Sequence, residues 1–378
     1  MGHPRRYLDN AATTWPKPPE VIAAWRRAAE EVGATAGRGL YREAVEATAI
    51  QTRARAAAAR LLGGVDPRRV ALPSGCTLGL NVAIHGLVRP RDHVIATAAD
   101  HNATLRPLHA LARRGAIDLS IVPCDAAGLV DPAAIVTAWR PATRAVVCSH
   151  VSNVTGAIQD VAAIATIAHE RGGLVLLDAA QSLGVVPAER PGWGADVAVA
   201  PAHKWLHGTA GVAFLWTREG VEPPALVQGG TGSVSESLEM PEAFAERLEA
   251  GTPDVPALAA AAAAAAWLDE RGVAALGRGL AARCAAELAG LAGVWVARVA
   301  DAAPIVSFTV EGYDPADVAA ILEQAAGVQV RSGFHCAALV HEHLGTRAGG
   351  TVRASFGPFN TAADVEAVVG AVAAVVRG

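Results

Sequence analysis

The most restrictive feature of the sequence is an alternation of short apolar runs with helix-like segments between residues 69 and 216. The runs are rich in valine, alanine, isoleucine and leucine, as buried strands are. They cover residues 70–72, 94–97, 119–122, 145–148, 174–177, 196–200 and 211–216. Repeated strand–helix units predict an α/β protein with a mainly parallel sheet, covered by helices on both faces. The last run is expected to pair antiparallel at the sheet edge.

The pattern changes after residue 216, where glycine-rich loops replace the strand–helix units. An alanine-rich helix is expected near residues 257–268, and the strands become fewer. They are predicted at residues 294–299, 304–310, 328–330 and 352–356. The sequence therefore predicts a large domain of residues 15–254 with the mainly parallel sheet. It also predicts a smaller α+β domain made of residues 1–14 and 255–378.

Two chemically unusual residues follow separate apolar runs. Lys204 comes shortly after the run 196–200, and Asp178 directly follows the run 174–177. If these runs are neighbouring parallel strands, both side chains reach one carboxyl edge, where open α/β sheets bind ligands. A carboxylate opposite a Schiff-base lysine suits pyridoxal phosphate, because it keeps the pyridine nitrogen protonated while the lysine holds the aldehyde. A snorkelling surface lysine and a helix N-cap aspartate are the simpler alternatives.

Composition and charge argue against several classes of protein. The 378 residues carry a formal net charge of −4 and contain no basic run, so nucleic-acid binding is not expected. Residues 1–6 lack the apolar stretch of a secretory signal, and the apolar run at 257–268 is too short for a bilayer. Five cysteines without a CxxC pair favour a reduced, cytoplasmic protein, with Cys124, Cys148 and Cys284 as core residues.

Residues 73–77, Pro-Ser-Gly-Cys-Thr, form a tight turn between an apolar run and a helix. Such a turn exposes backbone N–H groups and the positive end of a helix dipole. An anion is therefore expected at this turn, although many strand-to-helix turns look alike.

Cys336 lies in a loop after a strand, between Arg331 and the adjacent His335. Positive neighbours lower the pKa of a thiol and make it more nucleophilic, so Cys336 is a candidate nucleophile. A structural cysteine is one alternative. A metal site is the other, because Cys336, His335, His341 and His343 are ligand types, but their spacing fits no common zinc pattern. No metal is predicted.

The order of these motifs resembles that of pyridoxal-phosphate enzymes of fold type I, in the class V aminotransferase superfamily. Within it the chain resembles the cysteine desulfurases, in particular the group II branch that includes selenocysteine lyases. The resemblance extends over nearly the whole chain. The segments that carry it are residues 7–14, 152–156, 178–181, 203–204, 250–253, 331–337, 351–356 and 359–361.

This resemblance implies that the cofactor is pyridoxal 5′-phosphate and assigns residues to it. Lys204 matches the Schiff-base lysine, which also moves the Cα proton. Asp178 matches the partner of the pyridine N–H, and Gln181 matches the donor to the phenolate oxygen. His101 matches the imidazole stacked on the cofactor ring and is, with Lys204, an expected catalytic residue.

The phosphate and the subunit arrangement follow from the same resemblance. Cys76, Thr77 and His203 match phosphate contacts. Gly251 and Thr252 match a loop that reaches the phosphate site of the partner subunit. The resemblance therefore implies a homodimer in which each active site needs both chains.

Substrate contacts are implied in the same way. Asn153, which also matches a cofactor contact, and Arg353 match the groups that hold the substrate carboxylate. Asn10 and Ala11 match residues of the substrate site, and Cys336 matches the sulfur-accepting nucleophile.

Two positions depart from the family pattern. Pro201 stands where the family usually has serine or threonine, so it supplies neither a phosphate hydroxyl nor an N–H group. Phe334 stands where group II members often carry histidine, which removes one acid or base beside Cys336. These departures bear on cofactor affinity and on rate.

The resemblance implies a cysteine desulfurase that converts L-cysteine to L-alanine and leaves the sulfur as a persulfide on Cys336. A sulfur-acceptor protein of unknown identity is then the expected partner. Alternatives on the same scaffold are a selenocysteine lyase acting on L-selenocysteine, a cysteine or cystine C–S lyase, and another class V aminotransferase-type reaction. A non-catalytic sulfur-relay protein is a further interpretation, against which Lys204 and Asp178 argue.

Overall fold

A computed structural model describes residues 3–272 and 277–377 of the chain. The predicted small domain also included residues 1–2, 273–276 and 378, and the secretory-signal prediction rested partly on residues 1–2. These residues lie outside the described ranges.

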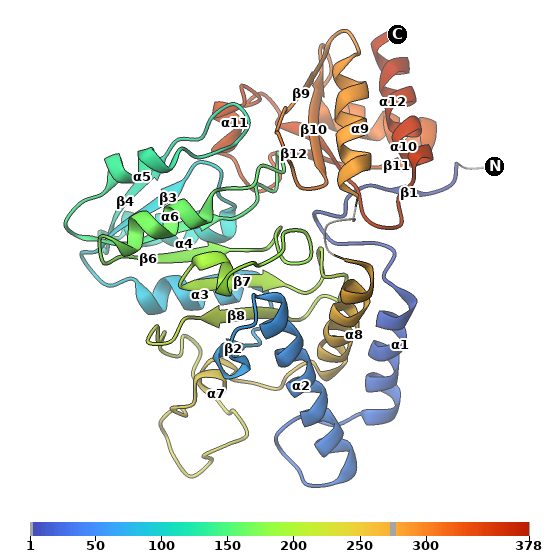
Figure 1. Ribbon diagram of the computed structural model, residues 1–378. Coiled ribbons are helices and arrows are strands. Elements are labelled where there is room, and N and C mark those ends of the chain that lie inside the picture. The colour runs from blue at the N-terminus through green and yellow to red at the C-terminus, as the bar shows by residue number, and fades with distance from the viewer. Residues whose placement is uncertain (1–2, 273–276, 378) are drawn as a thin grey trace.

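A seven-stranded sheet forms the centre of the molecule (Figure 1). Its strand order is β2-β8-β7-β6-β5-β3-β4. The strands are β2 (Val70–Ala71), β3 (His93–Thr97), β4 (Asp118–Val122), β5 (Thr143–Ser149), β6 (Leu174–Asp178), β7 (Val197–Pro201) and β8 (Ala213–Thr217). The five strands from β4 to β7 are parallel, which confirms the predicted mainly parallel sheet.

Strand β8 runs antiparallel to β7, as the sequence predicted. The prediction that it lies at the sheet edge is wrong, because the short strand β2 pairs antiparallel with its other side. Strand β2 covers Leu215 and Trp216 on that side, and all five residues of β8 are buried, which is consistent with its apolar sequence.

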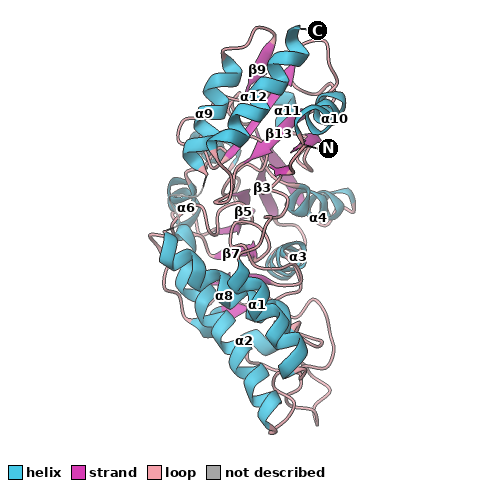
Figure 2. Ribbon diagram, turned by 90° about the vertical axis from the view of Figure 1, so that its right-hand side faces the viewer, coloured by secondary structure: helices cyan, strands magenta, loops and turns pink. Residues whose placement is uncertain are grey.

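Helices cover both faces of this sheet, and other helices pack against a second, smaller sheet (Figures 1 and 2). They are α1 (Pro19–Arg27) with the π-helical turn Ala28–Val32, α2 (Arg42–Leu61), α3 (Cys76–Leu87), α4 (Asn102–Arg113), α5 (Pro132–Ala138), α6 (Val161–His169), α7 (Phe244–Leu248), α8 (Val255–Arg271), α9 (Arg278–Ala289), α10 (Pro315–Ala326), α11 (Val340–His343) and α12 (Ala362–Arg377). Short 3₁₀ turns lie at Pro67–Arg69 and Pro191–Gly194. Within the described ranges, no helix is long and apolar enough to cross a membrane.

Alternate residues of the central strands point to opposite faces, as the pleat of a strand requires. In β6, Val175 and Leu177 join the core that contains residues of α2, α6 and α8. Leu174 and Leu176 join the core that contains residues of α3 and α4. Burial on both faces explains why β6 is a continuous apolar run ending in a single carboxylate.

The smaller sheet is antiparallel, with the order β12-β13-β10-β9. Its strands are β9 (Val294–Val296), β10 (Ile305–Val310), β12 (Arg331–Gly333) and β13 (Thr351–Ser355), and residues of α9, α10 and α12 share its core. Strand β1 (Arg6–Tyr7) pairs in parallel with β11 (Val328–Gln329), which brings the N-terminal segment to this unit.

The predicted domain boundary falls at the start of α8. Helix α8 packs on α1 and α2, and its buried residues belong to the core of the large sheet. Figure 2 shows these three helices side by side, away from the small sheet. We therefore propose that α8 belongs to the large domain and that the C-terminal part of the small domain begins after α8.

Gly184 packs closely against the backbone of Trp205, the residue that follows Lys204. Its φ is +95°, and a Cβ atom there would lie 2.3 Å from the carbonyl oxygen of Trp205. Gly184→Ala is therefore expected to lower the free energy of unfolding by more than about 1–3 kcal/mol, the cost of left-handed strain alone. Denaturant titration measures this loss. Gly172→Ala is the matched control, because Gly172 has a φ of +72° but open space around it. Equal losses in both variants would contradict the predicted clash.

Candidate functional site

Lys204 and Asp178 lie at the carboxyl ends of neighbouring strands. Strand β6 pairs with β7 in parallel, and Asp178 is opposite Val199 in that pairing. The predicted arrangement of the two strands is therefore confirmed. Burial lowers the pKa of Lys204, although the Asp178 carboxylate opposes this effect. A lysine in this environment holds a larger share of neutral, nucleophilic amine than a surface lysine does.

The carboxylate of Asp178 is buried, and burial raises its pKa, while Lys204 opposes the rise. Its Oδ1 atom accepts a hydrogen bond of 2.9 Å from the backbone N–H of Ala180. The thiol of Cys76 lies 3.9 Å from the same oxygen. Both contacts fix one oxygen of Asp178, and no hydrogen bond occupies Oδ2 within the described part of the chain.

Cys76 opens α3 at the predicted anion-binding turn. Its thiol points toward Asp178 and the carbonyl oxygen of Val199, which lies 3.7 Å away. Burial raises the pKa of the Cys76 thiol well above its ordinary value. The side chain of Cys76 therefore faces the buried carboxylate of Asp178. Among residues 3–272 and 277–377, no side chain caps this helix start.

His101 caps α4. Its Nδ1 atom accepts a hydrogen bond of 3.0 Å from the backbone N–H of Ala103, which places the proton of the neutral ring on Nε2. Burial, assisted by the nearby charge of Lys204, lowers the pKa of His101 to about 4. The ring is therefore neutral near pH 7. His203, beside Lys204, is neutral for the same reasons, because burial lowers its pKa to about 4.

Asp100 was not predicted from sequence. It is fully buried and accepts hydrogen bonds from the backbone N–H groups of Thr97 at 2.8 Å and Ser149 at 2.6 Å. The carboxylate thus joins the ends of β3 and β5, while burial raises its pKa to about 7. Its signal in the sequence was a carboxylate directly before His101, at the end of an apolar run.

The amide of Gln181 is oriented by Trp205. The indole N–H of Trp205 donates a hydrogen bond of 2.5 Å to Oε1 of Gln181, and Nε2 of Gln181 donates at 2.9 Å to the carbonyl oxygen of Ala11. An indole nitrogen only donates, so these contacts fix which end of the amide carries hydrogen. One N–H of Gln181 remains for a ligand. Trp205 is a second residue that sequence reasoning did not assign.

Arg353 projects from β13 and is 1% exposed. Its guanidinium donates hydrogen bonds of 2.8 Å to the carbonyl oxygen of Asn153 and to Oδ1 of Asp9. Its buried Nε atom has no partner in the described part of the chain. An unpaired buried N–H is costly, so this atom suits a carboxylate or another acceptor brought by a ligand.

Asn10 was predicted to contact substrate, but its side chain is engaged elsewhere. It donates to the carbonyl oxygen of Ser355 at 2.8 Å and to Oδ1 of Asn360 at 3.2 Å. Both amide hydrogens are therefore used within the protein. The predicted substrate roles of Asn10 and Ala11 stay predictions, and Asn10 has no free side-chain donor in this arrangement.

Cys336 is exposed in a loop with unusual backbone geometry. His335 and Cys336 both have positive φ angles, 49° and 61°, which non-glycine residues rarely adopt. Two hydrogen bonds of 2.7 Å hold this geometry. The side-chain amide of Asn153 donates to the carbonyl oxygen of His335, and the backbone N–H of Asn102 donates to the carbonyl oxygen of Cys336. Because Asn102 follows His101 directly, the loop lies next to the start of α4.

One guanidinium faces the sulfur. Arg331 Nη2 lies 3.4 Å from Sγ of Cys336. The prediction that His335 adds a second positive charge is wrong, because burial lowers the pKa of His335 to about 2 and keeps it neutral. Its Nε2 atom instead bonds to the Thr351 carbonyl at 3.1 Å. Phe334 packs edge-on against His341 and contributes no titrating group.

The metal alternative finds no support in the described ranges. No group of three or more histidine, cysteine, aspartate or glutamate side chains there is arranged to hold an ion. His341 is buried and bonds to Thr346 at 2.8 Å, rather than turning toward Cys336.

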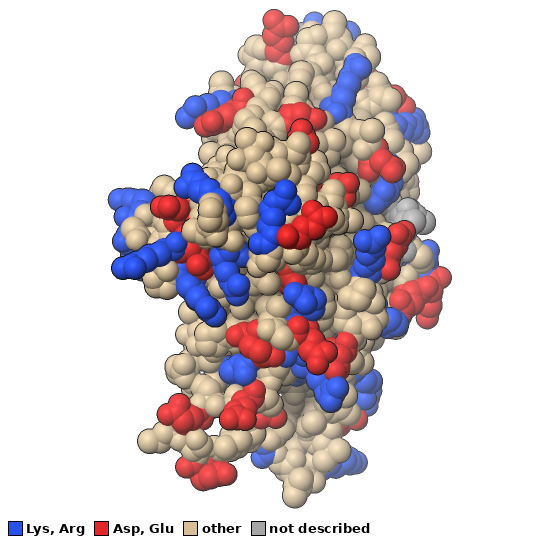
Figure 3. Space-filling model, turned by 60° about the vertical axis from the view of Figure 1, so that its left-hand side comes forward, with Lys and Arg blue, Asp and Glu red and all other residues tan. Residues whose placement is uncertain are grey.

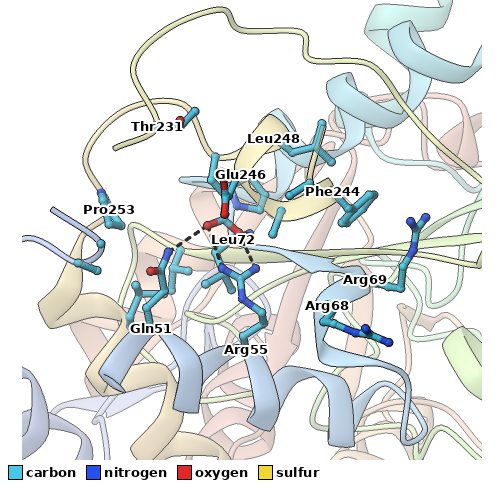
Figure 4. A pocket seen from close by; sticks show the side chains of 18 of the residues that line it. Gln51, Arg55, Arg68, Arg69, Leu72, Thr231, Phe244, Glu246, Leu248 and Pro253 are labelled. Atoms are coloured by element: carbon cyan, nitrogen blue, oxygen red, sulfur yellow. Dashed lines mark hydrogen bonds and ion pairs between the residues drawn. The ribbon is translucent and has the colours of Figure 1, made fainter. Parts of the chain in front are cut away.

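Gly251 and Thr252 lie between α7 and α8. They line an open cavity of about 1180 Å³ together with residues of α2 and α7, and Lys204 is not among its lining residues. In Figure 4, Gln51 and Arg55 project from α2 toward a carboxylate, that of Glu249, to which both bond. A role for this loop at a phosphate therefore depends on a second chain, as the sequence prediction required.

Comparisons with known proteins agree with this geometry. A model of the aminotransferase class-V family matches residues 6–368. A probable cysteine desulfurase of Methanothermobacter thermautotrophicus is 34% identical and covers 95% of this chain and 92% of its own. The cysteine desulfurase CsdA of Escherichia coli is 32% identical, covering 97% and 92%.

Solved structures are similar over the same extent. The apo cysteine desulfurase of Thermococcus onnurineus NA1 has a TM-score of 0.90 at 29% identity, covering 98% of this chain and 94% of its own. The S-sulfonic acid form of Escherichia coli CsdA has a TM-score of 0.89 at 29% identity, with the same coverage.

The chain therefore belongs to the aminotransferase class-V family, the fold type I group of pyridoxal-phosphate enzymes. Within that family it belongs to the cysteine desulfurases, which confirms the resemblance read from the sequence motifs.

The contact between Arg331 and Cys336 predicts a difference in thiol reactivity. Arg331→Met should slow alkylation of Cys336 by iodoacetamide about threefold to tenfold at neutral pH, because a nearby cation favours attack by sulfur. Peptide mass mapping over time measures the rate. Arg347→Met is the control, since Arg347 is exposed on the following segment and pairs with Glu342. Equal alkylation rates for both variants and the parent would contradict the role of Arg331.

Proposed function

We propose that the protein is a cysteine desulfurase that uses pyridoxal 5′-phosphate to remove sulfur from L-cysteine and release L-alanine. The observation that carries the proposal is the exposed thiol of Cys336, which faces Arg331 on a loop bonded to the start of α4. A nucleophilic thiol here has a use in sulfur capture and none in amino-group transfer. The relatives named as cysteine desulfurases support the same activity.

The residues suit pyridoxal 5′-phosphate in three respects. The Lys204 amine has a lowered pKa and can hold an aldehyde, while the free oxygen of Asp178 can pair with a pyridine N–H. The uncapped start of α3, at Cys76 and Thr77, offers N–H groups to a phosphate. The neutral ring of His101 can stack on the cofactor.

Each protein group then has a definite task. When bound, the cofactor withdraws electrons from the substrate and makes its Cα proton removable. Lys204 takes this proton, because burial favours its neutral amine. Arg353 binds the substrate carboxylate through its unpaired Nε–H, and Asp9 and the Asn153 carbonyl keep its guanidinium in place.

Sulfur transfer requires no added oxidant. The Cys336 thiolate attacks the substrate sulfur, so that an S–S bond forms as the C–S bond breaks. The electron pair of the C–S bond stays with the carbon fragment, which takes up protons and leaves as alanine. The persulfide remains on Cys336, whose exposure lets the thiol of an acceptor protein reach it.

Cys336→Ala tests this assignment. The variant should bind the cofactor as the parent does, because Cys336 makes no part of the proposed cofactor site. With an added thiol that reduces the persulfide to sulfide, release of sulfide and alanine from L-cysteine should fall by about 10²-fold or more, and protein-bound persulfide, measured without that thiol, should vanish. Enzyme assays and intact-protein mass spectrometry after one turnover measure both quantities.

The control for that experiment is Cys124→Ala, which removes a buried thiol from the core of the large sheet. It should retain parent activity. Desulfuration of L-cysteine by Cys336→Ala at the parent rate would make Cys336 structural and the enzyme a simple C–S lyase. The same assay with L-selenocysteine separates a desulfurase from a selenocysteine lyase, since selenium leaves carbon more readily.

We further propose that the active enzyme is a homodimer in which Gly251 and Thr252 complete the phosphate site of the partner subunit. The open cavity that they line supports this proposal, because Lys204 is not among its lining residues. Lys204→Ala and a Gly251→Asp/Thr252→Ala double variant should each be inactive. A 1:1 mixture, unfolded and refolded together, should recover about one quarter of parent activity, because half of the dimers carry one intact site of two.

A mixture that stays as inactive as its components would contradict shared sites. Separate refolding of each variant, followed by mixing without exchange, is the control and should give no activity. Light scattering on the same samples checks that both variants are dimers.

A further inference from the structure

The chain is nearly free of lysine. Of its 32 lysine and arginine residues, only Lys17 and Lys204 are lysines. The blue surface side chains in Figure 3 are therefore almost all arginines. Where a positive charge alone is needed, this protein uses arginine, so a lysine marks a place that requires a compact amine. Lys204 has such a requirement in the proposed chemistry, and Lys17 calls for an explanation.

Lys17 lies beside Lys204 in space. It is half-buried, just before α1, and its Nζ atom donates hydrogen bonds of 2.8 Å to the carbonyl oxygen of His203 and 2.7 Å to Oγ1 of Thr14. His203 directly precedes Lys204 in the chain. The Lys17 amine therefore contacts the backbone of the turn after β7 that carries Lys204.

Lys17 has no acidic partner to explain its position. Burial is the sole cause that shifts its pKa, which falls to about 7, and no carboxylate within the described part of the chain pairs with it. A cation placed for an ordinary surface ion pair remains solvated and keeps its usual pKa. Lys17 is held by neutral oxygens instead, which is a costly arrangement unless the contacts matter.

The contacts concentrate on one backbone carbonyl. Besides Lys17, the oxygen of His203 lies 3.1 Å from Oγ1 of Thr13 and 3.2 Å from both the N–H and Oγ1 of Thr14. Thr14 Oγ1 is also 3.1 Å from the carbonyl oxygen of Lys204. Residues 13–17 thus form hydrogen bonds with the backbone carbonyl groups on both sides of the Lys204 Cα atom, those of His203 and Lys204.

Among these donors, Lys17 makes the shortest contact with the His203 carbonyl and the one that charge assists. An ammonium group offers three tetrahedral N–H donors and so reaches a hydroxyl and a carbonyl together. A guanidinium is planar and wider, and cannot take the same place between Thr14 and His203.

We infer that Lys17 is a positioning residue for Lys204, acting through the His203 carbonyl to fix the turn from which the Lys204 amine reaches the end of β6. The importance of Lys17 for catalysis rests on the proposed function. The hydrogen bonds from residues 13–17 to the turn do not depend on that proposal. The compact amine is the required feature, so arginine is a poor substitute at position 17.

Lys17→Met and Lys17→Arg test the inference in the full-length protein without cofactor. Hydrogen exchange of the peptide spanning residues 200–208 should rise about tenfold in both variants, because a charge-assisted hydrogen bond to the turn is lost. The thermal midpoint should change no more than in Arg26→Met, an exposed cation of α1 that serves as the control. This readout needs no turnover, so its failure is distinguishable from a failure of the desulfurase assignment.

A second readout follows attachment of pyridoxal 5′-phosphate to Lys204 by absorbance and by borohydride trapping. Because the chain has two lysines, mass mapping identifies the trapped residue without ambiguity. Attachment should be about tenfold slower in both Lys17 variants and unchanged in Arg26→Met. Parent-like exchange and attachment in Lys17→Met would overturn the inference. Full rescue of both by Lys17→Arg would overturn the requirement for a compact amine.

Discussion

The parallel pairing of β6 with β7 is the constraint on which the rest of the site depends. It brings a buried carboxylate, Asp178, and a buried amine, Lys204, to one sheet edge. Neither group is stable there alone, because burial penalises the charged form of each. Their mutual attraction offsets part of that cost, and a ligand that pairs with both would offset more. The surrounding residues fix backbone and side chains around this pair.

The N-terminal segment links the two sheets at this point. Strand β1 pairs with β11 of the small unit, and Asp9 then pairs with Arg353 on β13. A few residues later Lys17 bonds to the turn that carries Lys204. One short segment therefore connects the proposed carboxylate-binding arginine to the proposed cofactor lysine. A displacement of this segment would move both groups, which ties substrate binding to the geometry of the base.

The loop that carries Cys336 has an unfavourable backbone conformation, which hydrogen bonds from other segments maintain. Two successive residues in the left-handed region are unfavourable by about 1–3 kcal/mol each, and the loop keeps them through bonds from Asn102 and Asn153. These bonds come from the first residue of α4 and from the connection between β5 and α6. The thiol is thus exposed to solvent, while its backbone is fixed against the site that contains His101. That combination suits a group that must receive sulfur inside the site and pass it to an external acceptor.

The sequence by itself determined the mainly parallel sheet, the positions of nearly all strands and the Asp178–Lys204 pair, because apolar runs on fully buried strands are a local signal. Motif order determined the family. Tertiary structure decided what depends on burial and on contacts between distant segments. It turned the Cys76 thiol toward Asp178, made His335 neutral, packed α8 on α1 and α2, and placed Lys17 against His203. Spacing along the chain carries no information on desolvation, so pKa values and hydrogen-bond partners were settled only when the fold brought these residues together.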